Sequence, residues 1–322
     1  MSLLSCHQLD VGYRHSRTEK RLFNALSLQL RPAALTCFMG PNGAGKSTLM
    51  RTLAGLHPPL AGHVQYQGRQ LEGSTAPEAI ALVLTERVTT THMTAREFVG
   101  FGRYPYLKWH LRLSTEDHEL IEQSLARVQV QDLANRSIAE LSDGQMQMVM
   151  IARALAQHTP ILLLDEPTAH LDLNNRVEIM NLLRRLAHEE NKSILVATHE
   201  LDLALQTADE IWLASDQHML VGIPEDLVLD GAFDRVFQLK GFDLRTGKIM
   251  HHDWRAKPVH VQGEGFALLW TRNALEREGF TLSAEAPTAV RVAQQGASLQ
   301  WHCGGHQFPT IRELVIHLTQ SK

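Results

Sequence analysis

The sequence predicts an α/β protein with a largely parallel sheet, followed by a smaller α+β domain. Three observations support this class. Short apolar runs alternate with longer helical patterns through the first 220 residues, helical signals dominate about residues 87–141, and polar residues replace periodic apolar ones around 241–257. Such alternation is typical of βαβ units. We therefore expect one domain over residues 1–245, with a helical insertion at about 87–141, and a small accessory domain over 246–322.

The composition is that of a globular chain. It has 322 residues, 44% of them hydrophobic, and 35 acidic against 31 basic residues give a net charge of −4. These values exclude a mainly disordered chain and argue against nucleic acid as a partner. Three cysteines are too few for a disulfide framework. We find no leader-like pattern and no run of 18 apolar residues, so we expect neither a signal peptide nor a membrane span.

The first 30 residues predict a small antiparallel β subdomain. Residues 3–11 and 22–30 have the pattern of strands and flank a polar loop at 14–21. A compact apolar run at 34–39 then predicts a strand of the parallel sheet, and residues 49–56 continue as a helix.

A glycine-rich loop joins that strand to that helix. It satisfies the pattern G-x-x-x-x-G-K-[ST] and reads Gly40-Pro41-Asn42-Gly43-Ala44-Gly45-Lys46-Ser47-Thr48. Its glycines let successive N–H groups point at phosphate oxygens, and the helix offers its positive end. In such a loop Lys46 bridges the β- and γ-phosphates and the Ser47 hydroxyl binds Mg²⁺. The simpler alternative is a glycine turn with an incidental lysine.

Two helix starts stand out in the middle of the chain. Residues 114–117, Ser-Thr-Glu-Asp, resemble a capping box ahead of an apolar stripe. Leu141-Ser142-Asp143-Gly144-Gln145 also fits a capped helix start, because Ser142 can accept from backbone N–H groups and Asp143 favours the positive end.

Two acidic residues follow the next buried strand. The apolar run 161–164 ends in Asp165 and Glu166, of which Asp165 can hold Mg²⁺ and Glu166 can act as a general base toward a γ-phosphate. Alone, such a pair is also common at a helix start. The parallel pattern then resumes with a strand at 194–197, and His199 stands at its C-terminal end.

The tail predicts a β-α-β-β-α accessory domain. Strands are expected at 259–261, 288–293 and 299–303, with helices at 267–277 and 311–318. One interpretation of the histidines in this tail is a transition-metal site. Its ligands would come from His251, His252, His302, Cys303 and His306. A strand-end cysteine is more often buried, so we favour a domain that helps dimerisation or senses a ligand.

Five motifs occur in an order that resembles the ATP-binding cassette of ABC transporters. They are Gly40 to Thr48, Leu141 to Gln145, Asp165 to Thr168, Ala169 to Asp172, and Thr198-His199, and the resemblance covers residues 1 to about 240. It implies a P-loop NTPase fold that binds ATP and Mg²⁺ and hydrolyses ATP, with Lys46, Glu166 and His199 as catalytic residues.

The resemblance also implies roles for residues outside the loop. Tyr13 stacks on adenine, and His199 contacts the γ-phosphate and holds Glu166 in place. The family forms a head-to-tail dimer in which one copy covers the ATP that the other copy binds. The covering residues are Ser142, Asp143, Gly144 and Gln145, and Asp172 links the two sites. Glu86 stands where the family has a metal-sensing glutamine, so it is an expected Mg²⁺ ligand beside Ser47 and Asp165.

The absence of predicted membrane helices implies separate permease subunits. Residues 95–99 and 102–106 resemble a stretch of bacterial importers of iron-siderophore complexes, haem and cobalamin. We therefore expect a peripheral ATPase on the cytoplasmic face of the inner membrane, working indirectly with a substrate-binding protein. An exporter ATPase would share every ATP motif. A soluble cassette ATPase acting on ribosomes or DNA is disfavoured by the single phosphate loop and the acidic balance.

Overall fold

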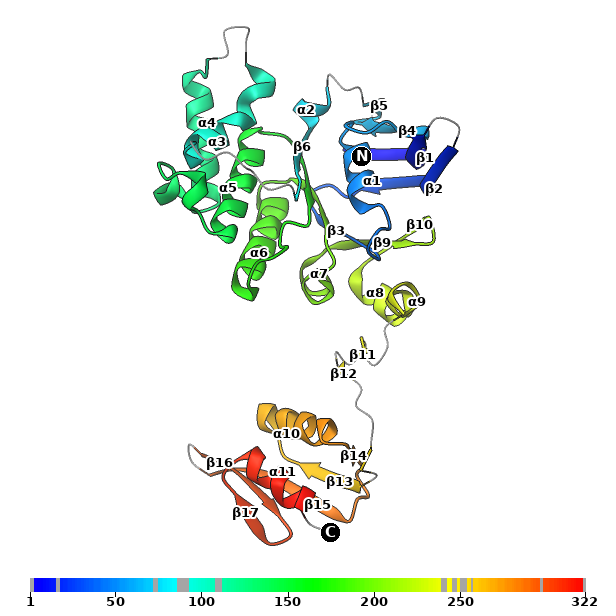
Figure 1. Cartoon of the computed structure of the whole chain (residues 1–322), viewed down its shortest axis with the longest axis vertical. Helices are drawn as coiled ribbons and strands as arrows, with labels where there is room; N and C mark the ends of the chain where they lie inside the picture. Colours follow the sequence, from blue (N-terminus) through cyan, green and yellow to red (C-terminus); the bar gives the residue numbers. More distant parts are fainter. Residues whose placement is uncertain are drawn as a thin grey trace. The chain divides into compact units, whose positions relative to one another are not determined.

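The chain divides into two compact units, Met1–Gln238 and Leu239–Lys322, which are described separately (Figure 1). The computed structural model describes residues 3–15, 18–71, 75–85, 93–107, 112–238, 242–244, 248–249, 254–255, 257–295 and 298–320. Within these ranges, none of the helices is long and apolar enough to cross a bilayer.

A six-stranded sheet of order β10-β9-β3-β8-β7-β6 is the centre of the first unit. The strands from β9 to β6 run parallel, and β10 pairs antiparallel with β9. Every residue of β3, β7 and β8 is buried, as expected for strands covered on both faces. The predicted parallel core sheet is confirmed. Its strands are β3 Leu35–Met39, β6 Ile80–Val83, β7 Ile161–Asp165, β8 Ser193–Ala197, β9 Glu210–Ser215 and β10 His218–Gly222.

The predicted antiparallel subdomain is also confirmed, as a sheet of order β2-β1-β4-β5. Its strands are β1 Leu4–His15, β2 Thr18–Leu30, β4 Ala61–Tyr66 and β5 Arg69–Gln70. The predicted loop at 14–21 is too long, because the hairpin ladder pairs residues 14–15 with 18–19 and also includes residues 20–21. Arg14 lies opposite Glu19, and Arg14 Nη2 is 2.8 Å from Glu19 Oε1. This cross-strand ion pair suits polar residues that extend a ladder beyond its apolar part.

Helices cover the sheets and fill the segment between β6 and β7. The α-helices of the first unit are α1 Lys46–Leu53, α2 Ala76–Ala79, α3 Ala95–Gly100, α4 Thr115–Arg127, α5 Asp143–Ala156, α6 Leu173–Glu189, α7 Leu201–Thr207, α8 Pro224–Leu229 and α9 Ala232–Phe237. Three 3₁₀ helices join them, namely η1 Phe101–Tyr106, η2 Gln131–Leu133 and η3 Ile138–Glu140. The capping box that starts α4 is present, with Ser114 bonded to the backbone N–H and side chain of Asp117.

One apolar core holds α1 between the two sheets. Leu49 of α1 belongs to the same buried cluster as Leu9 and Phe23 of the antiparallel sheet and Phe38 of β3. Burying each such side chain contributes about 1.5–3 kcal/mol. The loop before α1 is therefore anchored by packing on both sides of the helix.

The second unit is an α+β domain with a five-stranded sheet of order β14-β13-β15-β16-β17. Two helices pack on one face of it, around Leu275, Val290, Trp301 and Leu314. The expected β-α-β-β-α order omits β14 and β17. Each of these strands has only three residues, which is too short to show a periodic pattern. The elements are β11 Phe242–Asp243, β12 Lys248–Ile249, β13 Lys257–Gln262, α10 Gly265–Arg277, β14 Phe280–Leu282, β15 Thr288–Gln295, β16 Ser298–Cys303, β17 His306–Phe308 and α11 Ile311–Gln320.

Candidate nucleotide-binding site

The glycine-rich loop lies between the carboxyl end of β3 and the first turn of α1. Gly43 and Gly45 have φ angles of 79° and 97°, in the left-handed region that favours glycine. A Cβ atom on Gly45 would also come within 2.9 Å of the Leu22 side chain. Gly45 is the N-cap of α1 and caps it with no side-chain bond, so the first N–H groups of the helix are free to meet an anion.

Lys46 is buried at the start of α1, with 6% of its surface exposed. Its ammonium group donates to the carbonyl oxygens of Gly40 at 2.9 Å and Pro41 at 3.3 Å, both within the loop. Burial lowers the pKa of Lys46, and the nearby carboxylates of Glu166 and Asp165 act in the opposite direction. The ammonium group is thus held at the loop by weak carbonyl partners that a phosphate could replace.

Strand order brings the second acidic centre beside this loop. β8 lies next to β3, and β7 lies next to β8, so the carboxyl ends of all three strands meet at one edge of the sheet. Asp165, the last residue of β7, is 4% exposed. Burial raises its pKa, while a hydrogen bond from the Ser47 side chain lowers it. A buried carboxylate beside a hydroxyl is an oxygen donor set that suits Mg²⁺.

Glu166 and His199 meet at the same edge. Nδ1 of His199 lies 3.6 Å from Oε1 of Glu166. Glu166 has a φ of 49°, an uncommon value for a residue with a side chain, and its N–H donates to the carbonyl of Ala197 at 2.9 Å. This bond ties the turn after β7 to the end of β8 and fixes the direction of the carboxylate.

Tyr13 lies at the first turn of α1, beside the glycine-rich loop. Its hydroxyl is 2.7 Å from Oγ1 of Thr48, and its ring is 41% exposed. The ring of His57 lies 5.1 Å away, and His57 Nε2 is 2.8 Å from the carbonyl oxygen of Gly12. Sequence analysis missed His57, because it follows the helix in a segment that carries no motif.

Residues 142–145 form the first turn of α5. Ser142 Oγ accepts from the N–H of Gln145, whose side chain accepts in turn from the N–H of Ser142. Gly144 packs against α6, since a Cβ atom there would lie 2.9 Å from the Asn175 side chain. The predicted capped helix start is thus present, and its positive end lies at an exposed helix terminus.

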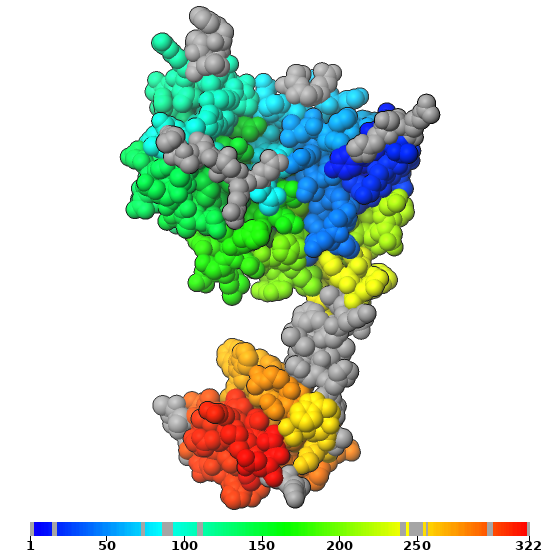
Figure 2. All heavy atoms as spheres, viewed as in Figure 1, coloured from blue at the N-terminus to red at the C-terminus, as the bar shows by residue number. Residues whose placement is uncertain are grey.

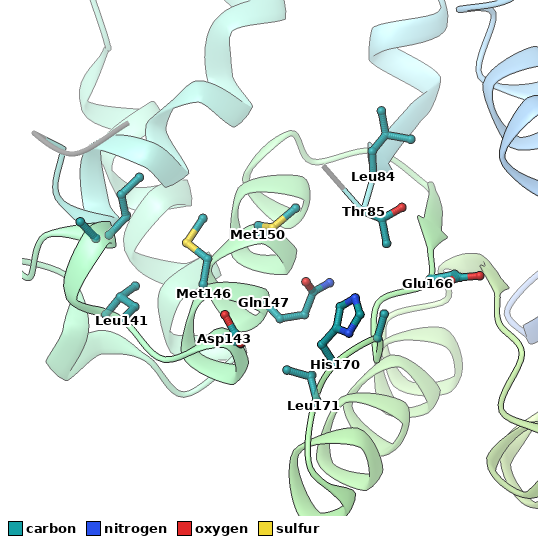
Figure 3. Close-up of a pocket in the computed structure, with 13 residues that line it drawn as sticks. Leu84, Thr85, Leu141, Asp143, Met146, Gln147, Met150, Glu166, His170 and Leu171 are labelled. Atoms are coloured by element: carbon teal, nitrogen blue, oxygen red, sulfur yellow. The ribbon is translucent and has the colours of Figure 1, made fainter. Parts of the chain in front are cut away.

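A groove of about 390 Å³ runs between α5 and the ends of β6 and β7. Figure 3 shows Asp143 and Met146 on one side, Leu84 and Thr85 on another, and Glu166 at its edge. None of the loop residues 40–48 lines this groove, whereas Asp143 does. Glu86, the next residue after Thr85, lies outside the described residues.

Asp172 is the N-cap of α6. Its carboxylate accepts from the N–H and the side-chain amide of Asn175, both at 2.9 Å. Asp172 therefore has a local structural partner as well as the role predicted for it from the resemblance.

Arg103 is a buried structural residue of the helical segment. It is 8% exposed, its Nε lies 2.7 Å from Asp117 Oδ1, and it also donates to the carbonyl of Ala156. Burial alone would raise the pKa of Asp117, but bonds from Ser114 and Arg103 lower it to about 2. The importer-like stretch thus uses Arg103 for packing.

The tail residues do not converge on a metal. His302 and Cys303 are neighbours on β16 and therefore point to opposite faces of the sheet, with Cys303 in the core. His306 instead lies against His317 of α11, with ring centroids 5.0 Å apart and the rings tilted by 51°. Among the described residues, no three potential ligands gather; His251 and His252 lie outside them.

Comparison with known proteins agrees with this geometry. The family model "ABC transporter" matches residues 23–169, and the model "Iron ABC transporter C-terminal domain" matches residues 256–319. The chain is 36% identical over 242 residues to an ABC transporter ATP-binding protein of Methanocaldococcus jannaschii, covering 74% of this chain and 82% of that one.

Two further relatives are ATP-binding proteins of named transport systems. The achromobactin transport ATP-binding protein CbrD of Dickeya dadantii is 33% identical over 74% of this chain and 89% of its own length. The ferric enterobactin transport ATP-binding protein FepC of Escherichia coli is 32% identical over 72% of this chain and 86% of its own.

Among solved structures, a dimeric bacterial ABC transporter cassette has a TM-score of 0.61 and 26% identity, covering 69% of this chain and 98% of that chain. These matches confirm the predicted P-loop cassette fold and the predicted ATPase class. The chain belongs to the ABC transporter family, of which it is a nucleotide-binding ATPase.

Proposed function

We propose that this chain is the ATP-hydrolysing subunit of an importer that takes up an iron-siderophore complex or a related chelate such as haem or cobalamin. The observation that carries the proposal is the meeting of Lys46, Asp165, Glu166 and His199 at one sheet edge. Relatives that act on achromobactin and ferric enterobactin support the choice of cargo. The second unit, matched by the iron transporter C-terminal model, supports the same choice.

The proposed hydrolytic step uses groups of this chain. Backbone N–H groups at the start of α1 and the Lys46 ammonium bind the β- and γ-phosphates, and Tyr13 turns its partly exposed side chain to adenine. Glu166 accepts a proton from the attacking water. His199 orients the Glu166 carboxylate and donates to the γ-phosphate. In our proposal Ser47 and Asp165 hold Mg²⁺, which supplies charge neutralisation at the phosphates.

The proposed assembly is a head-to-tail homodimer. The start of α5, residues 142–145, of which Ser142 and Asp143 are exposed, is suited to bind the γ-phosphate held by the second copy, because its N–H groups and its dipole favour an anion. Asp172 would lie between the two sites. Closure on ATP binding and reopening on hydrolysis then drive transport.

The proposed partners are integral membrane permease subunits, which this peripheral chain would contact from the cytoplasmic face of the inner membrane, with a substrate-binding protein acting indirectly. The surface we assign to the permease is the helical insertion together with the region around Glu86, next to Leu84 and Thr85 at one side of the groove in Figure 3. Glu86, the next residue, is the proposed link between that contact and the bound metal. Glu86→Gln should change the Mg²⁺ dependence of turnover, and an unchanged dependence would remove this residue from the ligand set.

The proposal is tested by measuring uptake in a strain of the source organism from which this gene has been deleted. We expect the wild-type chain to restore uptake of ⁵⁵Fe-siderophore, haem or ⁵⁷Co-cobalamin. The Glu166→Gln chain should not restore it. Normal uptake of all three in the deletion strain would overturn the proposal. Loss of efflux would indicate an exporter, and sedimentation of the chain with ribosomes in place of a permease would indicate a soluble ATPase.

A further inference from the structure

The second unit contains a groove that the proposed transport cycle does not use. It has a volume of about 660 Å³ and lies between α10 and α11, which pack against each other. Both helices form part of the surface of this unit, orange for α10 and red for α11 in Figure 2. Small-molecule sites typically occupy about 300–1,000 Å³, so the groove is large enough for a ligand.

The groove is apolar between the helices and aromatic at one side. Ala274, Ile311 and Val315 line it from the two helices. Trp270 also lines the groove and is 63% exposed as a residue, although a tryptophan is usually largely covered. These side chains favour a ligand with a flat apolar body.

Arginines supply the charge of the groove. Arg255 is already engaged, because its Nε donates to the Glu278 carbonyl at 2.7 Å and its guanidinium lies 4.0 Å from the ring centre of Trp254. Glu278 also places a carboxylate oxygen 3.9 Å from Arg255 Nη2. Arg277 and Arg312 have no acidic partner within ion-pair distance among the residues that the structure describes.

We propose that this groove binds a small aromatic anion, with the ring against Trp270 and the acidic group between Arg277 and Arg312. Guanidinium groups bind carboxylates through paired N–H donors and also stack on flat rings. The two arginines come from different helices, Arg277 from the end of α10 and Arg312 from the start of α11. A bound anion would therefore link the two helices and change how they pack against each other.

The test is calorimetric titration of the full chain with 2-naphthoate, in saturating ADP and Mg²⁺ so that the nucleotide site is filled. Binding tighter than about 1 mM is expected, with little binding of the neutral 2-naphthamide. Arg277→Gln and Arg312→Gln should each weaken binding about tenfold, because each removes a charged hydrogen bond. Trp270→Ala should also weaken it.

Arg272→Gln is the matched control, since Arg272 is an exposed residue of α10 that does not line the groove. It should leave binding unchanged. Equal binding of the acid and the amide, no binding heat, or arginine variants that bind like the wild type would overturn the proposal. If Trp270→Ala and Arg312→Gln instead change the association state in sedimentation while 2-naphthoate gives no heat, the groove is a contact between copies of the chain and the proposal is wrong.

Discussion

Nδ1 of His199 lies 3.6 Å from Oε1 of Glu166, although the two residues follow different strands. The contact arises because β7 and β8 are parallel neighbours, with Asp165 opposite Ala197, so that the turns after them start side by side. The Glu166 N–H bond to Ala197 locks this arrangement. The sheet therefore brings together the two residues that we propose as the general base and the group that orients it.

Glu166→Gln should abolish most turnover and keep ATP binding. The amide cannot accept the proton of the attacking water, and general base catalysis is worth about 10²–10⁴-fold. Phosphate release measures turnover, and equilibrium dialysis with labelled ATP measures binding. Glu178→Gln, an exposed carboxylate on α6, is the control and should behave as wild type. A Glu166→Gln chain that hydrolyses ATP at the normal rate would show that another group is the base.

His199→Ala should reduce turnover with little loss of ATP affinity, because in our proposal His199 acts on the Glu166 carboxylate and the γ-phosphate, while Lys46 and the glycine-rich loop hold the nucleotide. His199→Gln keeps a hydrogen-bond donor and should recover part of the rate. A weakening of ATP binding equal to the loss of rate would assign His199 to ground-state binding.

Several candidate residues could be predicted from the sequence, because their motifs are continuous and follow fully buried strands. Asp165 ends β7, His199 lies just after β8, and Lys46 starts the helix after the loop that follows β3. Contacts between distant segments were not predictable. His57 reaches Tyr13 only through the path of the chain after α1, and Arg103 reaches Ala156 only through helix packing.

Lys46→Met should weaken ATP binding by about tenfold or more, because a charged hydrogen bond to phosphate is worth about 1.5–3 kcal/mol. The pKa of Lys46 is lowered by burial, so the free protein loses this charge at a lower pH than an exposed lysine does. Bound phosphate stabilises the charged form, and affinity should therefore fall as pH rises from the lowered pKa toward the pKa of the complex. Titrations across alkaline pH should show this fall in the wild type and lose it in Lys46→Met.

Asp165→Asn should raise the Mg²⁺ concentration that half-maximal turnover needs. Burial raises the pKa of Asp165, so its carboxylate takes up a proton at a higher pH than an exposed aspartate does. Metal affinity of the wild type should then decrease as pH falls toward that raised pKa. Manganese titration followed by electron paramagnetic resonance measures this directly; a variant with unchanged manganese affinity would exclude Asp165 as a ligand.

Arg103→Met should destabilise the first unit far more than Arg96→Met. Removing one member of a buried pair leaves the Asp117 charge unpaired, at a cost of about 3–5 kcal/mol, whereas the more exposed pair of Arg96 and Glu122 is worth at most about 1 kcal/mol. Urea denaturation of both variants measures the difference.

The ion pair between Arg103 and Asp117 also predicts that the free energy of unfolding decreases at low pH. The pKa of Asp117 is lowered from 3.8 to about 2, so its stabilising effect is complete above pH 3.8 and is lost as pH falls through about 2. Asp117→Asn should lack this decrease, because it removes the titrating group. Equal losses of stability in Arg103→Met and Arg96→Met would contradict this prediction. An Asp117→Asn chain that keeps the wild-type dependence of stability on low pH would also show that the buried ion pair does not stabilise the helical segment.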